Sequence, residues 1–130
     1  ETSTTNQLDI LINIVKNYGM LNHVTWISFG YDQLQYIVSV NNSARVGFVV
    51  TNITNNAVDK TLELKTSSNH VFIDCSSETY TENIDYAISK NVPVEVWVLN
   101  DEDKILNMHP YISGVTSDLQ VADKVLEESY

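Results

Sequence analysis

The sequence is poor in cysteine and in basic residues, and each shortage excludes a class of protein. Cys75 is the only cysteine among 130 residues, so one chain can form neither an internal disulfide, nor a CxxC redox pair, nor a cysteine-based zinc site. Lys and Arg total 7 against 17 Asp and Glu, and the resulting net charge of -10 repels nucleic acid and anionic lipid. We therefore expect no nucleic-acid partner.

Long apolar runs are also missing. None approaches the roughly 20 residues of a membrane-spanning helix, and the first nine residues are polar and acidic. We expect no transmembrane segment and no signal or transit peptide in this sequence. The 43% hydrophobic composition is enough for the core of one domain, so residues 1–130 are expected to form a single domain.

What the sequence does contain is an alternation of two kinds of segment. The first kind is a short run of β-branched, aromatic and other apolar residues, typical of a buried strand. The predicted strands are 24–29, 45–50, 70–75, 93–99 and 111–116.

The intervals between these runs have helical spacing. The predicted helices are 6–18, 31–40, 56–67, a segment between Thr79 and Asn91, a short helix that carries Ile105 and Leu106, and one that follows Ser117. The expected N-terminal signals are capping boxes at Thr4 with Gln7, Thr79 with Glu82 and Ser117 with Gln120, and an Asn100 cap on the short helix. Gly19 and Asn91 are the expected C-terminal stops, because both residue types tolerate the left-handed conformation.

Alternating helices and near-continuous apolar strands predict an α/β fold with parallel strands joined by right-handed crossovers. Two architectures satisfy this pattern. One is a doubly wound open sheet of five strands, and the other is a consecutive arc of a (β/α) barrel. Composition does not separate them.

Three stretches carry a resemblance to a known family. They are VTWISFGYDQLQ at 24–35, VPVEVWVLNDEDKIL at 92–106 and YISGVTSDL at 111–119. In this order they resemble the C-terminal half of the glycerophosphodiester phosphodiesterases, whose strands end in Ser-Phe-Asp, then in Trp-Thr-Val-Asn, and whose final strand reads roughly Gly-Ile-Ile-Thr-Asp. The counterparts here begin at Ser28, Trp97 and Gly114. The resemblance implies about the last five β/α units of a TIM-like barrel of eight parallel strands.

The resemblance also implies a reaction. The family hydrolyses glycerophosphodiesters to glycerol 3-phosphate and an alcohol, with a His-Arg-Gly motif, a Glu-x-Asp pair, a second histidine and a Glu-x-Lys strand. Its two histidines act as acid and base, and its carboxylates hold Ca²⁺ or Mg²⁺. Arg45 is the only arginine here and it stands at the start of a predicted strand, between Ala44 and Val46, so the His-Arg-Gly motif is absent.

One segment mimics the Glu-x-Lys strand. Leu62-Glu63-Leu64-Lys65 has the right spacing, but it follows the Ser-Phe match, whereas the family's copy precedes that match. We expect Glu63 and Lys65 to lie on a solvated helix instead. The sequence thus predicts no catalytic residue and no metal ligand set, and no cofactor bound by this chain alone; Ca²⁺ or Mg²⁺ is expected only for the complete family site.

The predicted substrate-binding residues lie where strands end, the edge at which α/β barrels build their sites. They are Ser28, Phe29, Trp97 and Asn100. Gly30 and Val98 depart from the family's Asp and Thr, so the substrate contacts need not be the family's own.

Three carboxylates near this edge have structural explanations. Alternation places Glu95 inside the barrel with Trp97, where a salt bridge is the simplest explanation for a charge. Asp74 and Asp118 stand where carboxylates bind metals, although an Asp near a helix start is more often a cap.

Two functions stay open. The first is the C-terminal part of a glycerophosphodiesterase-like barrel, whose reactive groups lie outside these residues. The second is a catalytically inactive module, derived from a barrel and kept for binding or assembly. An arc of parallel strands exposes apolar side chains and unpaired strand edges, so the expected partner is the N-terminal half of the barrel or a second copy of the chain.

Overall fold

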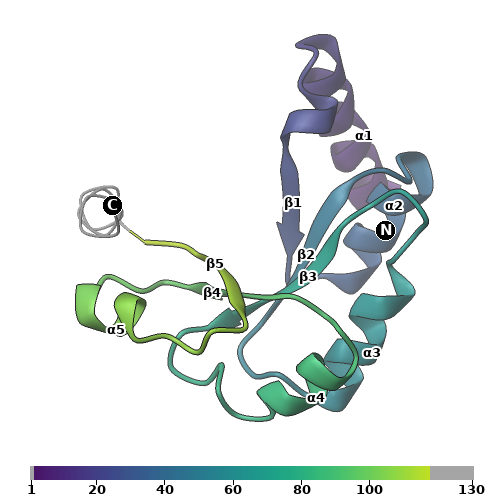
Figure 1. The fold of residues 1–130 in the computed structure, drawn as a ribbon. Coiled ribbons are helices and arrows are strands. Elements are labelled where there is room, and N and C mark those ends of the chain that lie inside the picture. Colours follow the sequence, from purple (N-terminus) through teal and green to yellow (C-terminus); the bar gives the residue numbers. More distant parts are fainter. Residues whose placement is uncertain (1, 118–130) are drawn as a thin grey trace.

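The computed structural model describes residues 2–117, in which strands and helices alternate along the chain (Figure 1). The strands are β1 (Thr25–Ser28), β2 (Arg45–Val50), β3 (Val71–Ser76), β4 (Val94–Trp97) and β5 (Ile112–Val115). The helices are α1 (Thr2–Asn17), the 3₁₀ turn η1 (Leu21–His23), α2 (Tyr31–Val40), α3 (Asn55–Glu63), α4 (Ile84–Ser89) and α5 (Glu102–Leu106). All five predicted strands are confirmed, and the predicted bounds of β2 and α2 are those of the structure.

The strands form one parallel sheet in the order β1-β2-β3-β4-β5. Each crossover therefore adds the next strand at the same growing edge. A doubly wound sheet must instead reverse direction at a switch point, with strands added on both sides of the first. The doubly wound alternative is wrong, and the sheet is a consecutive arc.

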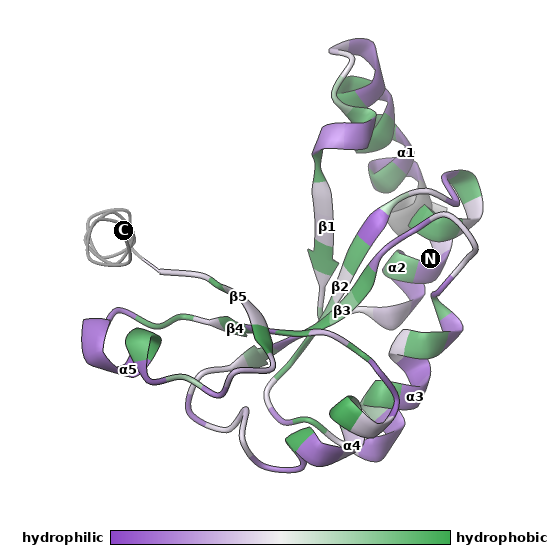
Figure 2. Ribbon diagram, in the orientation of Figure 1, coloured by the Kyte–Doolittle hydropathy of each residue, from purple (hydrophilic) through white to green (hydrophobic). Residues whose placement is uncertain are grey.

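The helices that contact the sheet lie on one of its faces. α2 packs against β1 and β2, α3 packs against β2 and β3, and α1 and α4 pack against α2 and α3 respectively (Figure 1). These helices carry both hydrophobic and hydrophilic residues, as helices with one buried side do (Figure 2). The fully buried side chains between the two layers include Leu34, Val46, Val58, Ile73, Val94 and Val96.

The expected helix stops are confirmed by the backbone. Gly19 has φ of 68°, and the amides of Gly19 and Met20 donate to the carbonyls of Lys16 and Val15, which closes α1 with a Schellman motif. Asn91 has φ of 58° just after α4.

The capping boxes predicted at Thr4 with Gln7 and at Thr79 with Glu82 are wrong. α1 begins at Thr2, before Thr4, and α4 begins only at Ile84. The Thr79 hydroxyl donates to the Thr51 carbonyl instead, so it ties the turn after β3 to the turn after β2. This tertiary bond competes with the local cap, and the helix starts later.

Two further helix predictions need correction. Asp101, not Asn100, caps α5, and its carboxylate accepts from the Lys104 amide at 3.1 Å. α3 ends at Glu63, which is exposed on the helix as predicted, whereas Lys65 lies beyond the helix end. The Ser117–Gln120 box, the helix after it and Asp118 involve residues outside the described part of the chain.

Within residues 2–117, no helix combines the length and the apolar character that crossing a membrane requires.

Candidate substrate-binding groove

One face of the sheet carries no described helix, and we call it the inner face. The residues on this face include Ile27, Gly47, Val49, Phe72, Asp74, Glu95 and Trp97, together with Gly114 on β5. Side chains alternate along a strand, so Val94 and Val96 are buried toward the helices while Glu95 and Trp97 point the other way. The predicted inward direction of these two side chains is confirmed.

A shallow groove of about 360 Å³ lies on the inner face where the strands end. The residues that line it are Ile27, Ser28, Phe29, Val49, Asp74, Trp97, Val98 and Thr116. They come from all five strands or from the residues directly after them. Parallel strands bring their carboxyl ends to one edge, which is why residues far apart in the sequence meet there.

Two aromatic rings form a corner of this groove. The centroids of Phe29 and Trp97 lie 6.3 Å apart and their planes cross at 77°, an edge-to-face arrangement. The Trp97 indole Nε1 donates to the backbone carbonyl of Asp74 at 2.9 Å, which holds the ring against β3. Phe29 is 63% exposed, so its ring is open to a bound molecule.

Asp74 is the ionisable residue of the groove lining. Its side chain is only 5% exposed, and its Oδ1 is buried without a hydrogen-bond partner among the described residues. Burial, and to a smaller extent the nearby charge of Glu95, raises the pKa of Asp74 from 3.8 to about 6. An acceptor atom without a partner in an apolar lining is costly, and this burial favours the protonated form of the carboxyl group.

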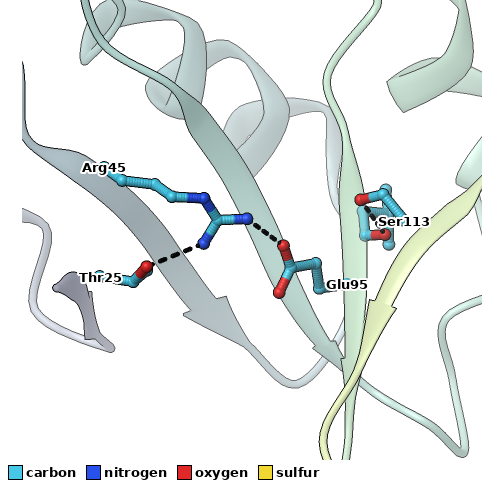
Figure 3. Close-up of polar contacts among 5 residues, drawn as sticks. Thr25, Arg45, Glu95 and Ser113 are labelled. Carbon is cyan, nitrogen blue, oxygen red and sulfur yellow. Dashed lines mark hydrogen bonds and ion pairs between the residues drawn. The ribbon is translucent and has the colours of Figure 1, made fainter. Parts of the chain in front are cut away.

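Glu95, the neighbouring carboxylate on β4, forms a salt bridge with Arg45 (Figure 3). The Arg45 Nη2 lies 2.5 Å from the Glu95 Oε2, and the Nη1 donates to the Thr25 hydroxyl at 3.1 Å. The guanidinium also lies 4.4 Å from the centroid of the Phe72 ring. The salt bridge predicted for Glu95 is confirmed, although the sequence did not identify its partner, which lies 50 residues away.

Two glycines make room for these inner side chains. A Cβ at Gly47 would lie 2.3 Å from the Phe72 ring, and a Cβ at Gly114 would lie 2.8 Å from the Glu95 carboxyl carbon. The register shift between β4 and β5 sets Gly114 directly beside Glu95. A side chain at either position would force the side chain of the neighbouring strand to shift.

The four predicted substrate-binding residues are not all brought together. Ser28, Phe29 and Trp97 line the groove, whereas Asn100 is exposed beyond β4 and does not line it. The Ser28 hydroxyl already donates to the Gln33 side chain at 2.6 Å and accepts from the Gly30 amide at 2.9 Å. A role for any of the four in binding substrate stays a prediction.

The described residues do not form a divalent-cation site. Nowhere in residues 2–117 do three or more His, Cys, Asp or Glu side chains come together as a ligand set. The two neighbouring carboxylates do not supply one, because Glu95 is engaged by Arg45 and Asp74 is buried. Their arrangement does not fit the Ca²⁺ or Mg²⁺ of the family.

Comparison with solved structures finds the same arrangement of strands and helices. A glycerophosphodiester phosphodiesterase from Parabacteroides distasonis matches 99% of this chain with a TM-score of 0.75 and 13% sequence identity. A protein from Silicibacter pomeroyi, assigned as a glycerophosphoryl diester phosphodiesterase, matches 98% with a TM-score of 0.77 and 12% identity. The fold is that of part of a glycerophosphodiester phosphodiesterase barrel. The predicted resemblance to this family and the predicted fold class, part of a TIM-like barrel with parallel strands, are confirmed.

The chain spans about half the length of these two relatives, 54% of the first and 46% of the second. No protein-family profile matches the sequence, and a search of the curated proteins finds no match. The likeness to glycerophosphodiester phosphodiesterases is thus a likeness of fold.

Proposed function

We propose that this chain forms part of the substrate mouth of a glycerophosphodiester phosphodiesterase-like barrel, with the catalytic and metal-binding groups outside it. The reaction of the complete barrel would be the metal-dependent hydrolysis of a glycerophosphodiester to glycerol 3-phosphate and an alcohol. The observation that carries the proposal is the groove at the carboxyl ends of the strands, with the two rings of Phe29 and Trp97 as its walls, on a sheet that matches part of that barrel.

The groove chemistry suits one part of such a substrate. None of its lining residues is Lys, Arg or His. A phosphate needs cationic or amide donors around it, so the phosphodiester itself would sit beside the rest of the barrel. The apolar walls of this chain would then hold the substituents of the phosphate rather than the phosphate.

The test is a hydrolysis assay with glycerophosphodiesters in the presence of Ca²⁺ or Mg²⁺. It compares this chain alone with the longest protein that its gene encodes. We expect no turnover by the chain alone and metal-dependent release of glycerol 3-phosphate by the longer protein. Turnover by the chain alone would contradict the placement of the reactive groups, and an inactive longer protein would contradict the hydrolase proposal.

A second function has its own supporting observation. Because residues 2–117 hold no ligand set for a metal, an inactive barrel-derived module for binding or assembly is consistent with the same fold. The hydrolysis assay on the longer protein distinguishes the two functions. If the longer protein binds glycerophosphodiesters but releases no product with Ca²⁺ or Mg²⁺, the result favours the inactive binding or assembly module.

A covering partner follows from the exposed inner face. Ile27 is 56% exposed and Val98 is 54% exposed there, and the outward edges of β1 and β5 have no strand partner among residues 2–117. The proposed partner is the remaining part of the barrel, in the same or another chain, or a second copy of this chain.

A further inference from the structure

A second pocket lies at the opposite edge of the sheet, where β1 and β2 begin, and we call it the amino-edge pocket. Its volume is about 370 Å³. The residues that line it are Leu21, Asn22, His23, Val24, Thr25, Ser43 and Arg45. The candidate substrate-binding groove lies where the strands end, and the two sites share no residue.

The charge of the amino-edge pocket is opposite to that of the chain. No Asp or Glu lines it, although 17 of the 130 residues are acidic, and its lining includes Arg45, the only arginine. Repulsion from distant exposed carboxylates is largely screened beyond about 8 Å at physiological ionic strength. The groups that touch a bound molecule therefore decide its affinity, and here they favour an anion.

Arg45 can bind an anion without leaving Glu95. A guanidinium has five N–H donors, and the printed bonds of Arg45 to the Thr25 hydroxyl and to Glu95 use one each (Figure 3). The Arg45 side chain is 38% exposed, so a solute can reach it. Glu95 offsets part of the positive charge, but it does not line the pocket.

Hydrogen-bond donors come from both sides of the pocket. They are the side chains of Asn22, His23, Thr25, Ser43 and Arg45. The Thr25 hydroxyl accepts from Arg45 and keeps its own O–H to donate. Donors from two strands suit a phosphate group, which has three terminal oxygens and close to two negative charges near pH 7. Leu21 and Val24 give the pocket an apolar part, which suits an organic substituent on the phosphate.

We propose that the amino-edge pocket binds a small phosphate monoester, with Arg45 as the charged contact and the hydroxyls of Thr25 and Ser43 as further donors. The site lies at the edge of the sheet opposite to the groove, and it does not depend on the proposed function.

The test is a calorimetric titration of the chain with phenyl phosphate at pH 7.5, matched by a titration with benzoate. The two probes carry the same ring and differ in the anionic group. We expect phenyl phosphate to bind at least about fivefold more tightly, because it offers more charge and more acceptor oxygens. Equal affinities, or no binding of phenyl phosphate, would overturn the proposal.

A charge-removing variant and its control locate the site. Arg45→Met should weaken the binding of phenyl phosphate at least about tenfold. Lys60→Met makes the same change in net charge on α3, outside the pocket, and should leave the affinity within about twofold of that of the natural chain. Equal losses in the two variants would show that only the overall charge matters and would overturn the proposal.

A second pair of variants does not depend on the fold tolerating the loss of Arg45. Ser43 is exposed, so Ser43→Asp places a carboxylate in the lining with little effect on folding, and it should weaken binding at least about tenfold. Ser89→Asp adds the same charge at the exposed end of α4 and should have little effect. Binding that survives Ser43→Asp would place the ligand elsewhere.

Glu95→Gln distinguishes a direct contact from a structural role of Arg45. This change removes the carboxylate that competes for the guanidinium, so phenyl phosphate should bind about threefold more tightly. If Arg45 only supported the shape of the pocket, the loss of its salt bridge would weaken binding. Unchanged or weaker binding would therefore contradict the assigned role of Arg45.

The outcome is separate from that of the hydrolysis assay. Hydrolysis by the longer protein with no binding of phenyl phosphate by this chain would support the proposed function and reject the phosphate site. Binding that is sensitive to Arg45 and Ser43, without hydrolysis by the longer protein, would do the reverse.

Discussion

Gly47 and Asp74 show how single residues shape the inner face. Gly47 has no side chain at the point where the Phe72 ring crosses from the neighbouring strand, and Phe72 is only 1% exposed. Asp74 places a carboxyl group among apolar neighbours. Neither role is visible in the sequence, because each depends on a side chain from another strand.

Replacing Gly47 with Ala should destabilise the fold. The new Cβ would lie 2.3 Å from the buried Phe72 ring, so the ring or the backbone must shift, and we expect a loss of about 1–3 kcal/mol in the free energy of unfolding. Urea denaturation measures it. Gly30→Ala is the matched control, because its Cβ would meet the nearest side-chain atoms at 3.2 Å, and an equal loss in both variants would contradict the argument.

Asp74 predicts a pH-dependent difference in stability. Its pKa is raised from 3.8 to about 6 in the folded state, so the folded state binds the proton more tightly than the unfolded state does. The stabilisation by the protonated carboxyl is complete below pH 3.8 and is lost as the pH rises through 6. The free energy of unfolding of Asp74→Asn minus that of the natural chain should therefore be larger at pH 7.5 than at pH 4. The increase should be at most about 3 kcal/mol. Urea midpoints at both pH values check this, and a difference that is independent of pH would contradict it.

Individual elements follow local sequence signals except where a tertiary contact competes. β2 and α2 have the predicted bounds, because their apolar spacing agrees with their burial. α4 does not begin at its predicted capping box, because Thr79 bonds to the turn after β2. The helix spacing could be predicted from sequence, whereas the competing bond joins residues 28 apart.

The salt bridge between Arg45 on β2 and Glu95 on β4 can be measured as a coupling energy. Arg45 and Glu95 side chains are 38% and 21% exposed, so their interaction is partly shielded from water. A double-mutant cycle with Arg45→Met and Glu95→Gln should give a coupling of about 1 kcal/mol, larger than that of most exposed pairs. Urea denaturation of the four proteins measures it, and additive losses would show that the pair contributes nothing.

At the scale of the molecule, residues 2–117 form a sheet with one face covered by helices and one face that no described helix covers. The consecutive strand order matches part of a barrel, and the described helices that contact the sheet lie on its outside (Figure 1). Ile27 and Phe29 therefore remain exposed at 56% and 63% on the inner face. An apolar surface of this kind is typical of an interface.

This geometry predicts that the isolated chain self-associates through its inner face at micromolar concentration. Light scattering coupled to gel filtration measures the mass. Ile27→Lys should shift the chain toward monomer by placing a charge on that face, whereas Val40→Lys, at a position 50% exposed at the end of α2, should not. A monomeric natural chain would contradict the prediction, and an equal effect of both changes would place the contact elsewhere.

The sequence by itself determined the alternation of strands and helices, the parallel sheet and the motifs that resemble glycerophosphodiester phosphodiesterases, because these depend on the order and spacing of nearby residues. Only the tertiary structure decided between the two architectures, paired Arg45 with Glu95, and placed Asp74 beside the aromatic corner. Strand order and register bring together residues from distant parts of the chain, and no local pattern specifies which of them meet.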